Sequence, residues 1–552
     1  MKLSDLFIQE PPRLGNTWRG DLLLRDLLTG LLPDEAWQTI EPQLDSLGEL
    51  AGGELYELQL RDLPNEPRLT QYDAWGRRID RLELTAVWHR ARRVAAEFGL
   101  LAAGYDPRFG AAARVHEFAL AYLFSPSTDI YGCPLAMSDG ALAVLRQSGN
   151  EVLRRRAEPR LLSRDPEQCW TSGQWMTETT GGSDVGGTET VARQDAQGLW
   201  RLYGRKWFTS AATSEMALTL ARPEGAADGS SGLALFYLEP HDRSGRLSHI
   251  EILRLKDKLG TRKLPTAELW LDGVLAEPVS GLDRGVANIA PMLTLTRTWN
   301  AVTAAALLGR GVMLAADYAG RRSAFGARLA ALPLHRATLS ALQARAAATL
   351  HLAFAQVALL GAAEHGGSED ENVLRLITPI AKLATARDAV AGLSEVVESF
   401  GGAGYLEDTG LPQLLRDAQV LTIWEGTTNV LALDLLRALD QVGGLAVLHH
   451  HLTARLGRIP AKPEWSARLP TAAGAWRQWF EAEDENGRQA GARALALAHG
   501  RLIQAVSLLE QAARTPARAA FYQAAAARAA RRLLPDERLS AIPLLDDPAG
   551  DP

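Results

Sequence analysis

The chain has 552 residues, of which 47% are hydrophobic and 22% charged, with 59 Lys and Arg against 65 Asp and Glu and a formal net charge of −6. This length exceeds one compact unit, and the composition is that of a globular protein, so we expect several modules around a large buried core. The charge balance excludes a chain-wide attraction to nucleic acid or anionic membranes. The two cysteines, Cys133 and Cys169, exclude a disulfide scaffold and a thiolate metal site.

The first residues lack the long apolar core of a secretion signal, and no uninterrupted apolar run is long enough to span a bilayer. We therefore expect a cytoplasmic protein without a membrane span. No metal site is expected either.

The hydrophobic pattern divides the chain into five regions that are mostly helical. Apolar residues recur at helical spacing before about residue 161 and again after about 286, whereas short apolar runs separated by Gly, Asp and Pro turns fill the middle. The pattern predicts an α+β chain with a middle β-barrel-like domain between helical domains. The expected regions are an N-terminal extension (1–65), an N-terminal helical domain (66–170), the middle β domain (171–282), a helical bundle (283–440) and a separate C-terminal helical extension (441–552).

A loop rich in glycines and hydroxyl groups opens the predicted β domain. Residues 176–185 read MTETTGGSDV. Such a loop can bring backbone N–H groups and hydroxyls close to the polar edge of a ring or to a phosphate. The same composition is also that of an ordinary surface turn.

An aromatic strand follows at residues 204–210, with the sequence GRKWFTS. Because side chains alternate along a strand, Phe208 and Ser210 point to the same face, as a ring lying on that face requires. Packing of Trp207 and Phe208 in the core is the alternative. A further segment, KLGTR at 258–262, is interpreted chiefly as a fingerprint of the domain.

Two elements of the predicted bundle could bind phosphate. Arg322 lies in the segment YAGRRSAFG at 318–326, and a guanidinium can bond two phosphate oxygens at once. A glycine-rich loop follows at 401–404. A solvated arginine pair on a helix turn is the ordinary alternative.

The segment LTIWEGTTN at residues 421–429 carries a carboxylate at a defined turn. Thr427 or Thr428 can cap the helix that follows, so Glu425 is expected just outside the helix N-terminus, facing a cavity. A carboxylate on a turn is ordinarily only solvated.

Taken in this order, the segments resemble those of the acyl-CoA dehydrogenase family, over roughly residues 70–440. The resemblance implies FAD as cofactor and Glu425 as the base that removes the α proton of an acyl-CoA thioester while a hydride passes to flavin N5. It implies substrate contacts at Ser183 and Gly426. It implies cofactor contacts at Met176, Thr177, Gly182, Ser183, Phe208, Ser210, Arg322, Phe325, Glu398, Gly401, Gly402, Thr427 and Asn429. In the family the arginine and the glycine loop reach a neighbouring subunit's FAD, so we expect a homo-oligomer, a dimer of dimers. Electron-transfer flavoprotein is a candidate electron acceptor.

Trp424, Thr179-Thr180, Cys133-Pro134 and residues 71–78 further resemble the AidB-like branch, which is associated with alkylation stress, DNA binding and weak dehydrogenase activity. The last helical stretch is rich in arginine, and i, i+4 spacing predicts shared helix faces for two pairs that would contact DNA phosphates without reading sequence. A solvated face whose arginine stems pack on neighbours is the alternative. The two pairs are Arg514 with Arg518 and Arg528 with Arg532. Three functions remain open: an acyl-CoA dehydrogenase, a DNA-associated flavoprotein, and a non-catalytic acyl-CoA binder.

Overall fold

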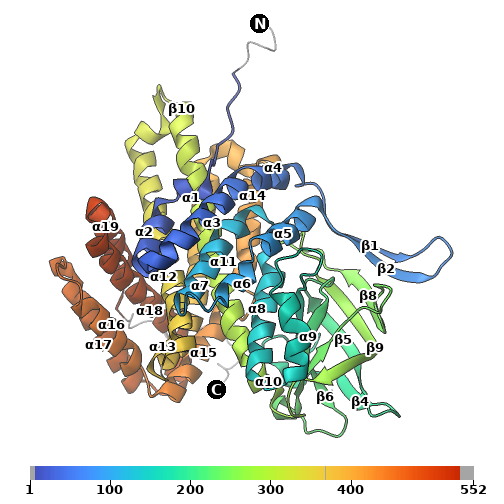
Figure 1. Ribbon diagram of the computed structural model, residues 1–552. Coiled ribbons are helices and arrows are strands. Elements are labelled where there is room, and N and C mark those ends of the chain that lie inside the picture. The colour runs from blue at the N-terminus through green and yellow to red at the C-terminus, as the bar shows by residue number, and fades with distance from the viewer. Residues whose placement is uncertain (1–6, 367, 532, 535–552) are drawn as a thin grey trace, which may run out of the picture.

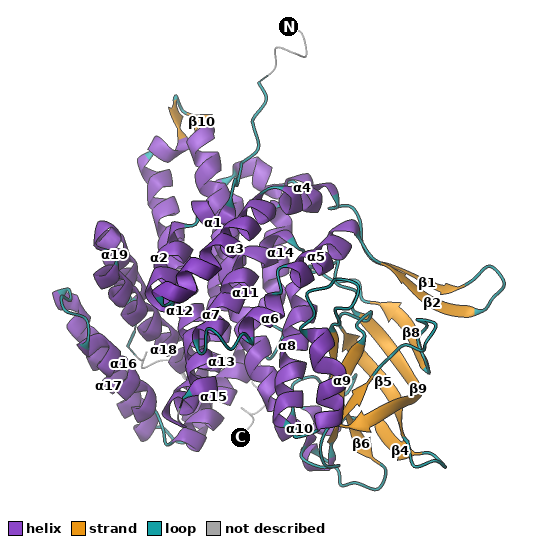
Figure 2. Cartoon of the chain, viewed as in Figure 1, coloured by secondary structure: helices purple, strands orange, loops and turns teal. Residues whose placement is uncertain are grey.

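The structure is a computed structural model that describes residues 7–366, 368–531 and 533–534. Figure 2 shows helices through most of the chain and most of the strands gathered at one side, with β10 apart from them at the opposite end. The elements follow the predicted order, with helices first, a β domain in the middle and a helical bundle after it (Figure 1). Short 3-10 turns connect several of them: η2 Ser125–Ser127, η3 Val185–Gly187, η4 Ser230–Gly232, η5 Leu329–Ala331, η6 Gly401–Tyr405, η7 Glu407–Thr409, η8 Glu464–Ala467 and η9 Pro516–Arg518.

The N-terminal part consists of nine helices among the described residues, with one hairpin between them. They are α1 Thr17–Gly20, α2 Leu22–Leu31, α3 Asp34–Gly52, α4 Glu54–Arg61, β1 Arg68–Tyr72, β2 Arg78–Glu83, α5 Ala86–Glu97, α6 Leu100–Gly104, α7 Ala112–Phe124, α8 Gly132–Gln147 and α9 Glu151–Leu161. The hairpin β1–β2, which the periodicity did not predict, projects from the body beside β8 (Figure 1).

The first 65 residues are more than an extension. Asn16 and Asp21 accept hydrogen bonds from the first turns of α1 and α2 and so fix where these helices begin. Trp18, Leu28 and Ile40 are buried in the same core as side chains of α7 and the later bundle helices. These N-terminal helices therefore cover the bundle.

The middle domain is a closed sheet. Its strands are β3 Ser172–Trp175, β4 Val191–Gln194, β5 Trp200–Thr209, β6 Met216–Pro223, β7 Ala234–Leu238, β8 Ile250–Leu255 and β9 Ala267–Pro278. Pairing runs β6-β4-β5-β9-β7 and returns to β6, with β3 beside β6 and β8 beside β9. The ring of pairings confirms the predicted barrel-like domain, and β3, β4 and β8 are strands that the sequence pattern did not reveal.

The bundle is built on three long helices. Its elements are α10 Gly285–Asn288, α11 Ala290–Arg321, β10 Ser323–Ala324, β11 Ala327–Arg328, α12 Pro333–His365, α13 Ser368–Ser399, α14 Leu411–Leu421 and α15 Thr428–Val442. By length and composition, α11 and α12 could each cross a membrane, because their most apolar stretches have mean hydropathies of 1.2 and 1.6. These stretches are 89% and 78% buried inside the protein, so packing in the core accounts for their composition.

The C-terminal helices are α16 Ala446–Gly457, α17 Arg468–Ala482, α18 Glu485–Arg514 and α19 Ala519–Ala529. The expectation of a separate appendage is wrong, because α18 packs against α12, α13 and α15 and shares their core. The tail also reaches the N-terminal helices. Asp26 on α2 accepts hydrogen bonds from Arg518 Nε at 2.6 Å and Tyr522 Oη at 2.8 Å, and its carbonyl accepts from Gln511 Nε2 at 2.9 Å.

Candidate active site

Glu425 lies in the turn between α14 and α15 and is held from several sides. Its Oε2 accepts a hydrogen bond from Thr296 Oγ1 at 2.8 Å, and its backbone carbonyl accepts from Arg297 Nε at 3.2 Å. The next carbonyl, of Gly426, accepts from Lys382 Nζ at 2.7 Å. Glu425 has a φ of +57°, a left-handed conformation that costs a non-glycine residue on the order of 1–3 kcal/mol. The surrounding contacts therefore impose the direction of this carboxylate.

The supporting residues come from α11 and α13. Burial lowers the pKa of Lys382 to about 7, while the charge of Glu425 acts in the opposite direction. Arg297 also pairs with Asp434 at 2.7 Å, which ties α11 to α15. Sequence reasoning missed Thr296, Arg297 and Lys382. The signal available for Lys382 is a lone cation within an otherwise apolar helical run.

The residues after Glu425 begin α15. Thr427 is the N-cap, and its side chain accepts a hydrogen bond from the Val430 N–H, which confirms the predicted cap. Asn429 is exposed, and its Oδ1 accepts from Arg493 Nη1 of α18 at 3.2 Å. The two predicted flavin contacts therefore lie at the first turn of this helix.

The glycine loop and the aromatic strand lie together, as predicted. The Trp207 N–H donates to the Thr177 carbonyl at 2.9 Å, which joins the loop at 176–185 to β5. Beneath them, the buried carboxylate of Glu178 accepts from Lys206 Nζ at 2.7 Å. A Cβ on Gly182 would lie only 3.1 Å from Thr177 Cγ2, so the loop is closely folded at that position.

Phe208 and Ser210 form the open side of this region. The Phe208 side chain is 50% exposed, and the Lys256 ammonium lies 4.7 Å from its ring centroid. Ser210 Oγ is 3.3 Å from Thr266 Oγ1, which accepts from Lys258 Nζ at 3.0 Å. Burial lowers the pKa of Lys258 to about 8. An open aromatic face beside a fixed hydroxyl fits an isoalloxazine ring. The segment at 258–262 therefore does more than identify the domain, because Lys258 donates a hydrogen bond to the Thr266 hydroxyl.

Cys133 lies at the start of α8, and burial raises the pKa of its thiol to about 12. The helical and β modules meet next to the base turn. The Thr261 N–H of the β domain donates to Asp417 Oδ1 on α14 at 2.6 Å, and α14 leads into the turn that carries Glu425.

The other predicted FAD contacts lie elsewhere in the same chain. Arg322 follows Thr296 by 26 residues, or about 39 Å along a helix at about 1.5 Å per residue. The Tyr318 ring stacks on Phe400 at 4.5 Å, which brings the Arg322 segment and the glycine loop to the same end of the bundle. Gly401, Gly402 and Glu398 are exposed there. These residues cannot touch a ring bound beside Glu425 of their own chain.

The turn between β10 and β11 carries Phe325, which is 97% exposed at a φ of +50°. Arg322, next to this turn, has its guanidinium 5.5 Å from the Phe7 ring and lies within 3.4 Å of Gln9 Oε1. The N-terminal residues therefore border this second group of predicted contacts.

The two arginine pairs predicted to contact DNA do not form as expected within the described residues. α18 ends at Arg514 and Pro516 begins η9, so Arg514 and Arg518 do not share a helix face. Arg518 is instead bonded to Asp26. Arg528 is exposed on α19. Arg532 lies outside the described residues.

Comparison with known proteins gives three consecutive family matches. The model described as Adaptive response protein AidB N-terminal domain matches residues 9–168, and those described as acyl-CoA dehydrogenase middle and C-terminal domains match 173–274 and 283–439.

Among curated relatives, acyl-CoA dehydrogenase family member 11 of Caenorhabditis elegans is 45% identical over 78% of this chain and 72% of that protein. AidB of Escherichia coli (strain K12) is 32% identical over 73% of this chain and 74% of that protein. The solved structure of Caenorhabditis elegans ACDH-11 in complex with C11-CoA has a TM-score of 0.93 at 37% identity, covering 97% of this chain and 94% of that one. An acyl-CoA dehydrogenase of Bacillus anthracis complexed with FAD shares the fold, with a TM-score of 0.70 at 18% identity over 94% and 90% of the chains. The chain belongs to the acyl-CoA dehydrogenase family, which is FAD-dependent, and its N-terminal region matches AidB.

Proposed function

We propose that this protein is an FAD-dependent acyl-CoA dehydrogenase that introduces a double bond between the α and β carbons of an acyl-CoA thioester. The observation that carries the proposal is the strained carboxylate of Glu425, whose turn is held by hydrogen bonds from Thr296 on α11 and Lys382 on α13. The exposed ring of Phe208 is proposed to carry the flavin that this base faces. The acyl-CoA complex of the ACDH-11 relative supports the substrate class.

Each protein group has a defined task in this reaction. Glu425 takes the α proton, and Thr296 orients its carboxylate through the 2.8 Å hydrogen bond. Gly426 and Ser183 are proposed to contact the thioester. Bound FAD supplies the acceptor for the β hydride, since no protein side chain can take one.

The two separate groups of FAD contacts support a homo-oligomer, and we propose a dimer of dimers as its arrangement. A residue about 39 Å from Thr296 along α11 can serve a flavin only if that flavin belongs to another subunit. Arg322, Phe325 and the glycine loop at 401–402 are proposed to complete a neighbour's site, with Arg322 on its pyrophosphate. The exposed ring of Phe325 is suited to such a contact.

The decisive experiment is anaerobic titration of the purified yellow protein with a panel of acyl-CoA thioesters, followed by flavin absorbance. We expect bleaching by a substrate and recovery of colour with an electron acceptor such as electron-transfer flavoprotein. Glu425→Gln should keep the flavin but lose the bleaching, because the amide cannot take a proton. The matched control is Glu481→Gln, which alters an exposed carboxylate on α17 and should behave as the unmodified protein.

Two results would contradict the proposal. One is a protein that takes up no flavin, and the other is a Glu425→Gln variant that bleaches normally. A protein that binds acyl-CoA tightly without flavin reduction would instead support the non-catalytic binder.

The DNA-associated alternative draws support from the match to AidB. Its predicted contacts are reduced, because Arg518 is bonded to Asp26. Duplex binding that falls steeply with salt and weakens in an Arg528→Ala variant would favour this function.

A further inference from the structure

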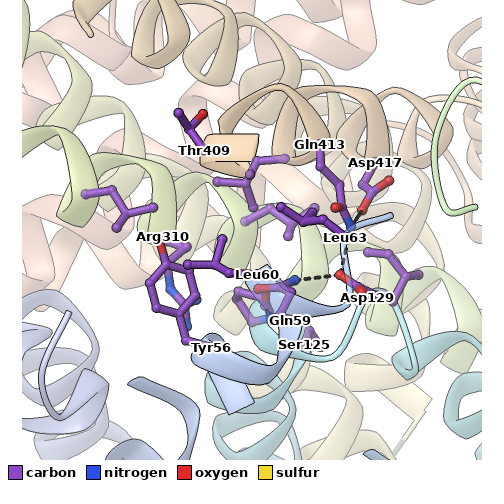
Figure 3. Close-up of a pocket in the computed structure, with 16 residues that line it drawn as sticks. Tyr56, Gln59, Leu60, Leu63, Ser125, Asp129, Arg310, Thr409, Gln413 and Asp417 are labelled. Carbon is purple, nitrogen blue, oxygen red and sulfur yellow. Dashed lines mark hydrogen bonds between the residues drawn. The ribbon is translucent and has the colours of Figure 1, made fainter. Parts of the chain in front are cut away.

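The turn that carries Glu425, residues 422–427, lies between α14 and α15, and the helix before it is held by the rest of the protein. Gln413 of α14 donates to Asp129 Oδ1 at 2.7 Å, and Figure 3 shows these two side chains pointing toward each other. Further along α14, Asp417 accepts the Thr261 N–H at 2.6 Å. The entry to the turn is therefore fixed to the N-terminal helical domain and to the β domain.

The exit from the turn is held differently, because one side chain binds both the turn and the helix that follows it. Arg297 Nε donates to the Glu425 carbonyl at 3.2 Å, and Nη1 of the same guanidinium donates to Asp434 Oδ2 at 2.7 Å. Asp434 belongs to α15. Since a guanidinium is planar and rigid, the position of the Asp434 carboxylate determines where Arg297 Nε lies.

Asp434 carries the charge that this arrangement needs. Its side chain is 12% exposed. Burial acts to raise the pKa of Asp434, but the hydrogen bond from Arg375 and the charge of Arg297 outweigh burial, so the pKa lies below its ordinary value. The carboxylate is therefore ionised at neutral pH. Without it, the Arg297 side chain, which is 14% exposed, would have no ion-pair partner among the described residues.

A second arginine binds the same carboxylate but does not continue to the turn. Arg375 on α13 donates from Nη2 to Asp434 Oδ1 at 2.9 Å and from Nε to Gln441 Oε1 at 3.2 Å. Asp434 and Gln441 are both on α15. Within the described residues, the hydrogen bonds of Arg375 thus only fasten α13 to α15, whereas those of Arg297 reach Glu425 as well. The two arginines allow fastening of the helix to be separated from positioning of the base.

Glu425 is held by α11 at both its side chain and its main chain. Thr296 bonds the carboxylate at 2.8 Å, and Arg297 bonds the carbonyl of the same residue. The left-handed φ of +57° at Glu425 is a strained conformation, and such a conformation persists only while the surrounding contacts impose it. Loss of the main-chain contact should therefore let the turn relax and change the direction of the carboxylate.

We propose that Asp434 is a positioning residue for the catalytic base and acts through Arg297 on the main chain of Glu425. The inference rests on the proposed function, in which Glu425 removes the α proton. Asp434 holds the guanidinium, the guanidinium holds the Glu425 carbonyl, and the carbonyl fixes the direction in which the carboxylate leaves the main chain. Asp434 takes no part in the proton transfer itself.

The test compares Asp434→Asn with Arg375→Met in the flavin-loaded protein. Asp434→Asn removes the charge that holds Arg297 and keeps a side chain of the same shape. Arg375→Met removes the other ion pair of the same carboxylate and is the matched control. Hydrogen exchange of the peptide at 421–429, followed by mass spectrometry, reports the turn without any turnover. We expect exchange to be on the order of 10-fold faster in Asp434→Asn and unchanged in Arg375→Met.

Anaerobic bleaching at saturating acyl-CoA is the second measurement. In Asp434→Asn the rate should fall roughly 10-fold while the dissociation constant for acyl-CoA changes by less than about threefold, because only the proton transfer depends on the direction of the carboxylate. Asp434→Glu, which keeps the charge, should recover part of the rate. Both Asp434→Asn and Arg375→Met should make the protein easier to denature, so a loss of stability alone cannot produce the expected difference between them.

If Arg375→Met speeds the exchange and slows the bleaching as much as Asp434→Asn does, Asp434 only fastens α15 and the inference is overturned. Unchanged exchange in Asp434→Asn overturns it as well. Should Asp434→Asn fail to fold, Arg297→Lys beside Arg375→Lys makes the same comparison, because one ammonium on a flexible stem cannot replace two guanidinium nitrogens.

The two measurements also separate this inference from the proposed function. A protein that shows the expected exchange but never bleaches keeps the positioning of the turn and loses the dehydrogenase function. A protein that bleaches at the same rate in every variant keeps the dehydrogenase function and loses the role of Asp434.

Discussion

Replacing Lys382 with methionine tests how the base turn is built. The Lys382 side chain is fully buried, and burial lowers its pKa from 10.5 to about 7, which corresponds to about 5 kcal/mol at about 1.4 kcal/mol per pKa unit. The pKa of Lys382 is lower in the folded protein than in the unfolded chain. The unfolding free energy is therefore highest above the unfolded-state pKa, and it decreases as the pH falls from there to the folded-state pKa. Between about pH 9.5 and about pH 7, the unmodified protein should lose about 3 kcal/mol of unfolding free energy relative to Lys382→Met.

The assay is chemical denaturation of both proteins at the two pH values, taken as a difference so that other titrating groups cancel. Lys462→Met, at an exposed lysine, serves as the control and should show no such difference. Parallel pH profiles for the unmodified protein and Lys382→Met would refute the reasoning. The methionine variant should also bleach more slowly with acyl-CoA, because the Gly426 carbonyl loses its donor.

Three further outcomes follow from the same structure. Glu178→Gln leaves the buried Lys206 ammonium without its counter-ion and should lower the unfolding free energy by about 3–5 kcal/mol, as measured by denaturation; a change no larger than that of a surface variant would contradict the ion-pair account. Thr296→Val should slow flavin bleaching by roughly tenfold, the equivalent of about 1.4 kcal/mol, because the Glu425 carboxylate loses its orienting hydrogen bond, whereas Thr296→Ser should not. Phe325→Ala should weaken subunit association and flavin retention while changing stability by under about 0.5 kcal/mol; sedimentation showing an unchanged assembly would argue against the shared site.

The local parts of the site could be predicted from sequence because each occupies one short segment with its own chemistry. The turn at Glu425, the cap at Thr427 and the strand with Phe208 all formed as expected. The residues that hold these segments in place could not be predicted in the same way. Thr296 lies 129 residues from Glu425 along the chain, and only the packing of α11 against the turn brings their side chains together.

The fold was predicted at the level of modules and less well at their borders. Helical and strand periods identify the bundle and the barrel, since each period reports local geometry. An amphipathic face does not say which element covers it, so the packing of α2 and α18 against the bundle was beyond the sequence pattern. The end of α18 was also misjudged, although Pro516 was the available signal.

The bonds between Asp26 and the last helices have a consequence for biosynthesis. Asp26 and Tyr522 are 496 residues apart in the chain. At a translation rate of roughly 5–20 residues per second, on the order of 25–100 s pass between the synthesis of α2 and the synthesis of Tyr522 on α19. During that interval the apolar surface that α18 and α19 will cover stays exposed, so this chain should depend on chaperones until synthesis is complete. Premature termination before α18 would leave a species prone to aggregation and degradation.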